Sequence, residues 1–319
     1  AWFQEVVLTC VAKFDSKRSE ANGMSPGLIW DQRKRTMPEG PECTRTARQV
    51  NRYVKGLTMV NVNIVSGRYT KKLPDGFDEF ISFLPLKVQE VTVKGKFIYW
   101  LLDKDISIWT TLGMTGNFKL QPSKHTRLAY YFDDGSAVYY NDMRNFGTTK
   151  FCFSALMLNA KINKIGPDML NNPCTLEDFI KIAKQKPKWS VVKWLMDQGQ
   201  ISGVGNIYKS ESLFLSGIAP QRKIESLTNE ELEKLYNAVC RILHSAYRDG
   251  GATIRNYSDL YDNHGKYTAF PSNIEQILEA RWDNKVMIYG RKEDIYGNPV
   301  QRIKLDDQRT TFWSPTVQK

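Results

Sequence analysis

Apolar and polar residues alternate at positions 60–64, where two valines and an isoleucine are separated by asparagines. This period of two predicts a half-buried β-strand. Residues 97–102 and 106–112 are largely apolar and predict buried strands. Residues 128–140 predict a β-hairpin, because an Asp-Gly pair that tolerates a positive φ separates two apolar segments. The region from residue 38 to about 155 is therefore predicted to be mostly β.

Beyond this region the apolar residues take a helical spacing. Thr175 with Asp178 predicts the N-terminal cap of one helix, and Thr228 with Glu231 forms the capping box of another. Apolar residues follow this capping box every three or four positions, so we expect them to form a stripe that faces the core. Two glycines at positions 250 and 251 predict the end of that helix. A helical domain is therefore expected after the β-rich one.

Two further elements complete the predicted architecture. Pro41 and Glu42 suit the first turn of a helix that opens the β-rich region, because proline is favoured there and a carboxylate stabilises a helix N-terminus. Near the end of the chain, segments at 286–289 and 300–303 flank a turn at 296–299. These segments predict a short β-hairpin.

The composition indicates a polyanionic partner. The chain has 319 residues, with 45 lysines and arginines against 34 aspartates and glutamates, which gives a formal charge of +11. Neutralising phosphates releases their counterions, so this excess favours nucleic acid, although plain solubility would also explain it. With 41% hydrophobic residues the chain can bury a sizeable core, which excludes a disordered or fibrous protein.

The cysteines and histidines offer no pattern typical of a metal site. The five cysteines lie far apart without a Cys-x-x-Cys pair, and the three histidines are scattered. We therefore expect no metal, no other cofactor and a reduced, intracellular protein. The longest uncharged run, residues 106–118, is shorter than the ~18 apolar residues of a membrane span, so no membrane helix is expected.

The segment from Met37 to Glu42 reads Met-Pro-Glu-Gly-Pro-Glu, so that two prolines bracket a glycine beside two carboxylates. With this string the chain resembles the formamidopyrimidine-DNA glycosylase and endonuclease VIII family of base-excision repair enzymes, in a form closer to endonuclease VIII. The resemblance extends from Met37 to the end of the chain. Further segments resemble family motifs in the right order, namely a Lys-Gly-Lys turn at 94–96, loops at 112–116 and 142–147, and a helix-two-turn-helix over 195–211.

The resemblance implies a catalytic role for four residues. Pro38 would be the nucleophile, because a proline at a free chain terminus is a secondary amine that can attack the sugar carbon and form a Schiff base. Glu39 would be the general acid or base, Glu42 would support the site from the helix start, and Lys96 would contact the phosphate beside the lesion. Without the resemblance, Pro38 and Pro41 would be helix-start residues and Lys96 a surface lysine.

Five further residues match DNA-binding positions of the family. Met114, Arg144 and Phe146 would form a wedge that fills the gap left by a flipped base. Asn206, with the glycines before it, would bind a backbone phosphate at a helix N-terminus, and Arg309 would reach a phosphate from the hairpin. Taken alone, Met114 would be core packing, Arg144 a surface charge and the glycines a turn between two helices.

The hairpin departs from the pattern of many relatives, which carry a four-cysteine zinc finger in this place. The strings Tyr-Gly-Arg-Lys at 289–292 and Arg-Thr-Thr-Phe at 309–312 are present, but no cysteine follows either of them. Trp-Ser-Pro at 313–315 occupies the segment where ligands would lie. The chain therefore resembles the zincless-finger members of the family, among them those of giant viruses and animals.

The resemblance implies an α+β fold in three parts. An N-terminal β-sandwich domain would span residues 38–155, a helical helix-two-turn-helix domain residues 156–280, and a zincless β-hairpin residues 281–319. Residues 1–36 would be a leader outside the mature enzyme. Any residue bound before Pro38 would turn its amine into an unreactive amide. We therefore expect translation to start at the preceding methionine, followed by its removal, or the leader to be cleaved.

The implied function is a bifunctional DNA glycosylase and abasic-site lyase that acts as a monomer on damaged DNA, double-stranded or partly single-stranded. It would flip an oxidised base, preferably a pyrimidine, displace it with the Pro38 amine and cut the strand by β,δ-elimination. One alternative is a family member that prefers 8-oxoguanine or formamidopyrimidines, with lesion choice set by a loop within residues 257–284. The other is a non-catalytic protein that binds damaged DNA.

Overall fold

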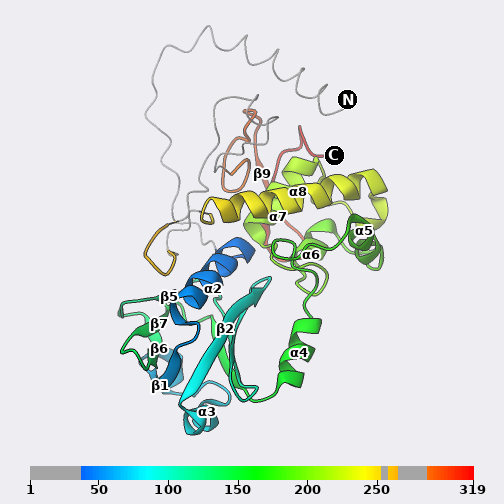
Figure 1. Cartoon of the computed structure of the whole chain (residues 1–319). Coiled ribbons are helices and arrows are strands. Elements are labelled where there is room, and N and C mark those ends of the chain that lie inside the picture. The colour runs from blue at the N-terminus through cyan, green and yellow to red at the C-terminus, as the bar shows by residue number, and fades with distance from the viewer. Residues whose placement is uncertain (1–36, 253–257, 265–285) are drawn as a thin grey trace, which may run out of the picture.

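The structure is a computed structural model that describes residues 37–252, 258–264 and 286–319. The predicted leader and most of the predicted lesion-choice loop lie outside these residues. Strands make up the lower body of the molecule in Figure 1, and most of the helices make up its upper part. The helix α2 (Gly40–Val54) lies where the two parts meet.

The β-rich part is an antiparallel sheet with the strand order β5-β7-β6-β1-β2-β3-β4-β8. Only two residue pairs join β1 to β2, at the middle of this order. The strands are β1 (Thr58–Ile64), β2 (Leu86–Lys94), β3 (Phe97–Leu102), β4 (Ser107–Thr111), β5 (Gly116–Lys119), β6 (Thr126–Phe132), β7 (Ala137–Asp142) and β8 (Thr148–Cys152).

The sheet folds back on itself into two facing layers. Trp100 of β3 and Tyr130 of β6 stack with their ring centroids 5.2 Å apart. In a flat sheet these strands would be three spacings of ~4.8 Å apart. The ring of Trp100 also lies 5.8 Å from that of Phe118 in β5, and all three side chains are fully buried. The rings form the core between the layers, which confirms the predicted β-sandwich of an α+β fold.

The strands with a clear local pattern form where they were expected. The predicted strands at 60–64, 97–102 and 106–112 correspond to β1, β3 and β4, and the predicted hairpin is formed by β6 and β7. The sequence pattern does not reveal β2, because its register shifts between Val88 and Glu90 and the bulge interrupts the period of two. The strands β5 and β8 give no clear signal, because β5 has a single large apolar residue, Phe118, and the apolar Phe151 and Cys152 of β8 are adjacent instead of alternating with polar residues.

The helical part shows the predicted caps. The Thr175 hydroxyl accepts a hydrogen bond from the backbone N–H of Asp178, and Thr228 and Glu231 form a complete capping box. The long helix ends before Gly250, as predicted, and that glycine has a φ of 84°. The helices are α3 (Phe77–Phe83), within the β-rich part, and then α4 (Ala155–Asn163), α5 (Leu176–Lys184), α6 (Val191–Met196), α7 (Asn206–Ser216) and α8 (Asn229–Arg248).

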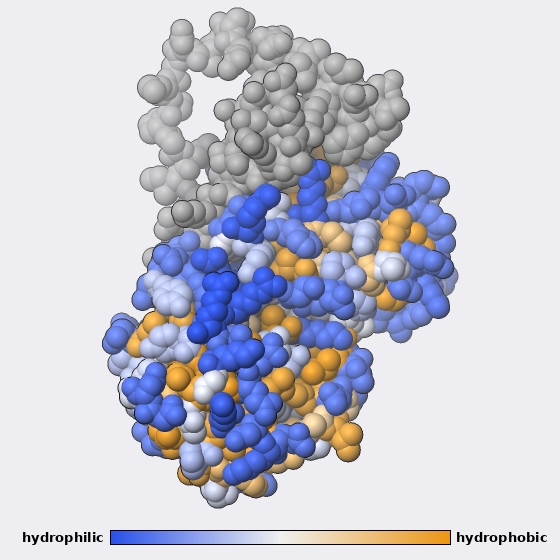
Figure 2. All heavy atoms as spheres, viewed as in Figure 1, coloured by the Kyte–Doolittle hydropathy of each residue, from blue (hydrophilic) through white to orange (hydrophobic). Residues whose placement is uncertain are grey.

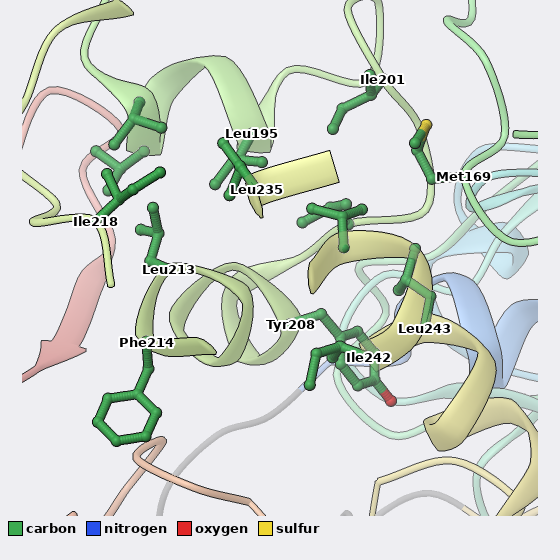
Figure 3. Close-up of a cluster of buried hydrophobic side chains, with 14 of the residues drawn as sticks. Met169, Leu195, Ile201, Tyr208, Leu213, Phe214, Ile218, Leu235, Ile242 and Leu243 are labelled. Atoms are coloured by element: carbon green, nitrogen blue, oxygen red, sulfur yellow. The ribbon is translucent and has the colours of Figure 1, made fainter. Parts of the chain in front are cut away.

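The apolar faces of α7 and α8 pack against each other to form a second core. Figure 3 shows Tyr208 from α7 close to Ile242 and Leu243 from α8, and Leu213 from α7 belongs to the same buried cluster. This packing confirms that the apolar stripe after Thr228 faces the core. Within the ranges that the structure describes, no helix is long and apolar enough to cross a membrane.

The C-terminal hairpin forms with one strand different from the prediction. β9 (Gln301–Lys304) pairs with β10 (Thr310–Trp313), and the turn predicted at 296–299 is also present, closed by a hydrogen bond from Asp294 N–H to the carbonyl of Asn298. The strand predicted at 286–289 is wrong. The backbone N–H groups of this segment instead donate to the carboxylate of Glu211 in α7, so they are not available for a strand ladder.

Replacing Trp100 with alanine is expected to destabilise the protein by about 3–5 kcal/mol, because it removes the ring that joins the two layers and leaves a cavity. Urea unfolding would measure the loss. The matched control is Trp100→Phe, which keeps an aromatic ring and gives up no hydrogen bond, since the indole N–H has no partner among the described residues. Equal losses in the two variants would contradict this role of the ring.

Candidate active site

Pro38 and Glu39 lie directly before α2, and both are buried. The carboxylate of Glu39 reaches the helical part, where it accepts hydrogen bonds from the backbone N–H groups of Ile207 (3.0 Å) and Tyr208 (3.4 Å) in α7. The first N–H groups of a helix have no partner within it, and the helix dipole favours a negative charge there. Glu39 therefore joins the start of α2 to the start of α7.

Glycines make room for this contact. A Cβ atom on Gly205 would lie 2.2 Å from the side-chain Cδ of Glu39. The backbone N–H of Gly40 donates a hydrogen bond of 2.8 Å to the carbonyl of Gly203, and a Cβ on Gly40 would lie 2.7 Å from that oxygen. The sequence pattern assigns the glycine turn at 203–205 to phosphate binding. The structure shows that its glycines are also needed for close packing against Glu39 and Gly40 at the start of α2.

Glu42 supports Glu39 from the first turn of α2. Its Oε2 atom accepts a hydrogen bond of 2.8 Å from the backbone N–H of Glu39. Its Oε1 atom accepts hydrogen bonds from the hydroxyl of Tyr208 (2.5 Å) and from the backbone N–H of Ala252 (2.7 Å). The buried carboxylate therefore connects α2 with α7 and with the segment after α8.

Burial tunes the ionisation of this group of side chains. Loss of contact with water raises the pKa of Glu39 from 4.5 to about 7, although the positive charge of Lys96 lowers it and the charge of Glu42 raises it further. Burial also lowers the pKa of Lys96, an effect that the negative charge of Glu39 opposes. A carboxyl group with a pKa near 7 can both donate and accept a proton at neutral pH.

The turn that carries Lys96 is tied to the helical part. The backbone N–H of Gly95 donates a hydrogen bond of 2.8 Å to the carboxylate of Asp168. The same carboxylate accepts the backbone N–H groups of Leu170 and Asn171, both at 3.0 Å. Asp168 therefore holds the Lys96 turn in place, and the sequence analysis does not identify it, because its partner lies 73 positions earlier in the chain.

The three predicted wedge residues lie together. The guanidinium of Arg144 donates to the sulfur of Met114 at 3.0 Å and lies 4.6 Å from the ring centroid of Phe146. Phe146 is 55% exposed. The buried carboxylate of Asp142 supports these loops, since it accepts the backbone N–H groups of Gly147 (2.7 Å) and Arg144 (3.2 Å). An exposed ring on a loop held by these hydrogen bonds is suited to insertion between the bases of a DNA duplex.

Asn206 and Arg309 lie at the junction of α7 with the hairpin. The side-chain amide of Asn206 donates a hydrogen bond of 3.1 Å to the carbonyl of Thr310, so it contacts the hairpin in this structure. Arg309 is exposed, and its positive charge contributes to lowering the pKa of Lys96. Arg309, Lys96 and Glu39 therefore share one electrostatic environment. Figure 2 shows hydrophilic side chains gathered on the face where the two parts of the molecule meet.

In the three described ranges, no three histidine, cysteine or carboxylate side chains are grouped so that they could hold a metal ion. Cys43, Cys152, Cys174 and Cys240 are free thiols.

Comparison with known proteins gives matches over both parts of the chain. The family model described as formamidopyrimidine-DNA glycosylase N-terminal domain matches residues 37–149, and the one described as formamidopyrimidine-DNA glycosylase H2TH domain matches residues 165–258. The formamidopyrimidine-DNA glycosylase of Mycoplasma mobile is 32% identical over 86% of this chain and 97% of that protein. The enzyme of Ligilactobacillus salivarius is 29% identical over 88% of this chain and 99% of that protein.

Solved structures show the same fold. The MutM (Fpg) protein of Thermus thermophilus aligns with a TM-score of 0.73 and 28% identity, over 88% of this chain and 98% of that one. A complex of a Lactococcus lactis Fpg variant with DNA that contains Fapy-dG also aligns with a TM-score of 0.73, at 24% identity, over 88% of this chain and all of that one.

The fold and these matches define the class of the protein, a DNA glycosylase of base-excision repair with abasic-site lyase activity, as predicted. More particularly, the chain belongs to the formamidopyrimidine-DNA glycosylase family.

Replacing Glu39 with glutamine is expected to make the stability of the protein less dependent on pH. A carboxyl group whose pKa rises from 4.5 to about 7 on folding binds more protons in the folded state, so stability falls as the pH rises through this window. Above about pH 7 Glu39 is ionised in the folded protein as well. Its burial then lowers the free energy of unfolding by on the order of 3 kcal/mol, at about 1.4 kcal/mol for each unit by which the pKa is raised. Urea unfolding at about pH 5 and pH 8 would measure the difference.

The matched control is Glu233→Gln, which changes an exposed glutamate of α8. This variant should follow the wild-type protein at both pH values. If the gap between wild type and Glu39→Gln stays the same at both pH values, the raised pKa of Glu39 is wrong.

Proposed function

We propose that the chain removes oxidised bases through a Schiff base with the secondary amine of Pro38. The Pro38 nitrogen would attack the anomeric carbon of the flipped nucleotide while the bond from that carbon to the base breaks, and the base would leave with a proton. The observation that supports this best is the adjacent buried carboxyl of Glu39. With a pKa raised to about 7, it can donate a proton to the sugar-ring oxygen as the ring opens.

Strand cleavage would follow from the same intermediate. The iminium bond makes the neighbouring C2′ hydrogen acidic, so loss of that proton expels the 3′ phosphate, and a second elimination expels the 5′ phosphate. Hydrolysis would then release Pro38. This β,δ-elimination requires a proton acceptor beside the iminium, and the ionised form of Glu39 can supply it.

We propose damaged duplex DNA as the partner. Solved Lactococcus lactis relatives are complexes with DNA that contains Fapy-dG or an abasic site. In this chain Lys96 and Arg309 supply positive charge to the site, and the wedge formed by Met114, Arg144 and Phe146 presents an exposed ring for insertion into the base stack.

Two lesion classes are candidates for the substrate. The named relatives are formamidopyrimidine-DNA glycosylases, which favours formamidopyrimidines and related oxidised purines. The Pro-Glu-Gly-Pro-Glu string and a hairpin without cysteines resemble the zincless endonuclease VIII side of the family, which favours oxidised pyrimidines. Competition between matched duplexes that carry a formamidopyrimidine or thymine glycol would separate these two candidates.

Borohydride trapping on an abasic-site duplex tests the nucleophile. Three proteins are compared: the full chain, a version that starts at Met37, and that version with Pro38→Ala. The version that starts at Met37 should form the covalent adduct and the full chain should not, because removal of the methionine frees the Pro38 amine. Pro38→Ala should trap more weakly, because a primary amine then replaces the secondary ring amine and no pyrrolidine ring fixes its position.

Binding of all three proteins to the duplex without any adduct would contradict the Schiff-base proposal and favour a non-catalytic protein that binds damaged DNA. An adduct of the full chain would show instead that a residue other than the amine of Pro38 is the nucleophile. Mass analysis of the N-terminus establishes in each case whether Met37 has been removed.

A further inference from the structure

A buried ion pair attaches the hairpin to α7. The ammonium group of Lys209 contacts the carboxylate of Asp307, and the two side chains are 0% and 1% exposed. Asp307 lies in the turn between β9 and β10, two residues before Arg309. The pair therefore joins the core helix of the helical part to the turn that presents Arg309.

The carboxylate of Asp307 also holds the backbone of Arg309. Its Oδ2 atom contacts Lys209, while its Oδ1 atom accepts a hydrogen bond of 3.1 Å from the backbone N–H of Arg309. Between them, Gln308 has a φ of 56°, a conformation that side chains rarely adopt and that its surroundings must impose. On the other side of Arg309, the carbonyl of Thr310 accepts the hydrogen bond from Asn206. Arg309 is thus fixed from both sides.

Both anchors come from the first turn of α7, the same turn that binds Glu39. Asn206 and Lys209 begin and end a four-residue stretch, and the two residues between them donate their backbone N–H groups to the Glu39 carboxylate. One helical turn therefore sets the position of the Arg309 backbone, from which its exposed side chain extends, relative to the buried acid.

The charges of Lys209 and Asp307 are buried, and each charge is stabilised by the other. Burial lowers the pKa of Lys209, and the charge of Asp307 opposes this change. Removing one member leaves the other as an unpaired charge in a buried site, so the turn must open to hydrate it. Lys209 cannot itself contact DNA in this structure because it is fully buried, so any effect on DNA must act through the turn.

We propose that Lys209 is a positioning residue, which through Asp307 holds the turn at 307–309 so that Arg309 meets a phosphate of the damaged strand. The proposal rests on the proposed function, because it assumes the phosphate contact of Arg309. It differs from a purely structural role, in which the pair would stabilise the fold and leave the DNA contact unchanged.

Binding of the full chain to a duplex with a tetrahydrofuran abasic-site analogue, measured by fluorescence anisotropy between about 50 and 200 mM salt, tests this proposal. Arg309→Ala should weaken binding about 5–10-fold and reduce the slope of log K against log salt by about 0.9, the value for one phosphate contact. Lys209→Met should give the same two changes. The double variant should bind no more weakly than either single variant, because both remove the same contact.

Three further variants make the result specific. Lys209→Arg retains the charge and should keep binding close to wild type. Asp307→Asn removes the charge of Asp307 but retains its size and an acceptor for the Arg309 N–H. It should weaken binding and reduce the salt slope as predicted for Lys209→Met, so it provides an independent test if Lys209→Met does not fold. Lys188→Met removes a lysine from an exposed pair with Glu225 and should leave the salt slope unchanged.

Two results would overturn the proposal. In the first, Lys209→Met and Asp307→Asn lower the thermal midpoint but retain the wild-type salt slope, while Arg309→Ala still weakens binding; this leaves the proposed function intact and reduces the pair to a structural role. In the second, Arg309→Ala has no effect on binding, and then the proposed DNA contact of Arg309 fails together with the role of Lys209.

Discussion

The contact between the Glu39 carboxylate and the first amides of α7 is the constraint on which the rest of the structure depends. It joins residues that are 168 positions apart, and it requires glycine at position 205, where a Cβ atom would overlap the Glu39 side chain. The same burial that makes the contact costly also raises the pKa of Glu39 to about 7. The stability lost in burying this acid and the proton chemistry it can perform therefore have one physical origin.

The helix α7 is the element to which the other parts of the site are attached. Its first turn binds Glu39 and holds the hairpin through Asn206 and Lys209. One turn further on, the buried carboxylate of Glu211 accepts the backbone N–H groups of three consecutive residues, at distances of 2.5 to 3.0 Å. The hairpin and the segment at 287–289 are therefore held against α7 by buried charged groups, of which Lys209 is paired with Asp307 and Glu211 accepts backbone hydrogen bonds.

Local patterns in the sequence predict much of the fold, whereas contacts between distant segments decide the remainder. The caps at Thr175 and Thr228 are readable because donor and acceptor lie three residues apart. The segment 286–289 looks like a strand, but its N–H groups belong to Glu211, 76 positions away from the first of them. Asp168 and Lys209 are not identifiable from sequence for the same reason, since an isolated aspartate or lysine gives no indication of a partner 73 or 98 positions away. The Pro38 and Glu39 string is readable only through its family resemblance.

The protonation state of Glu39 and the contact between the two parts of the molecule are coupled. The amides of Ile207 and Tyr208 and the dipole of α7 favour the ionised carboxylate, and Lys96 favours it as well. When Glu39 takes up a proton, these attractions weaken, but the backbone hydrogen bond between Gly40 and Gly203 does not involve the carboxyl group and is retained. A charge-independent contact thus lies beside the charge-dependent one. Glu39 can therefore change its protonation state while the start of α2 stays against the glycine turn before α7.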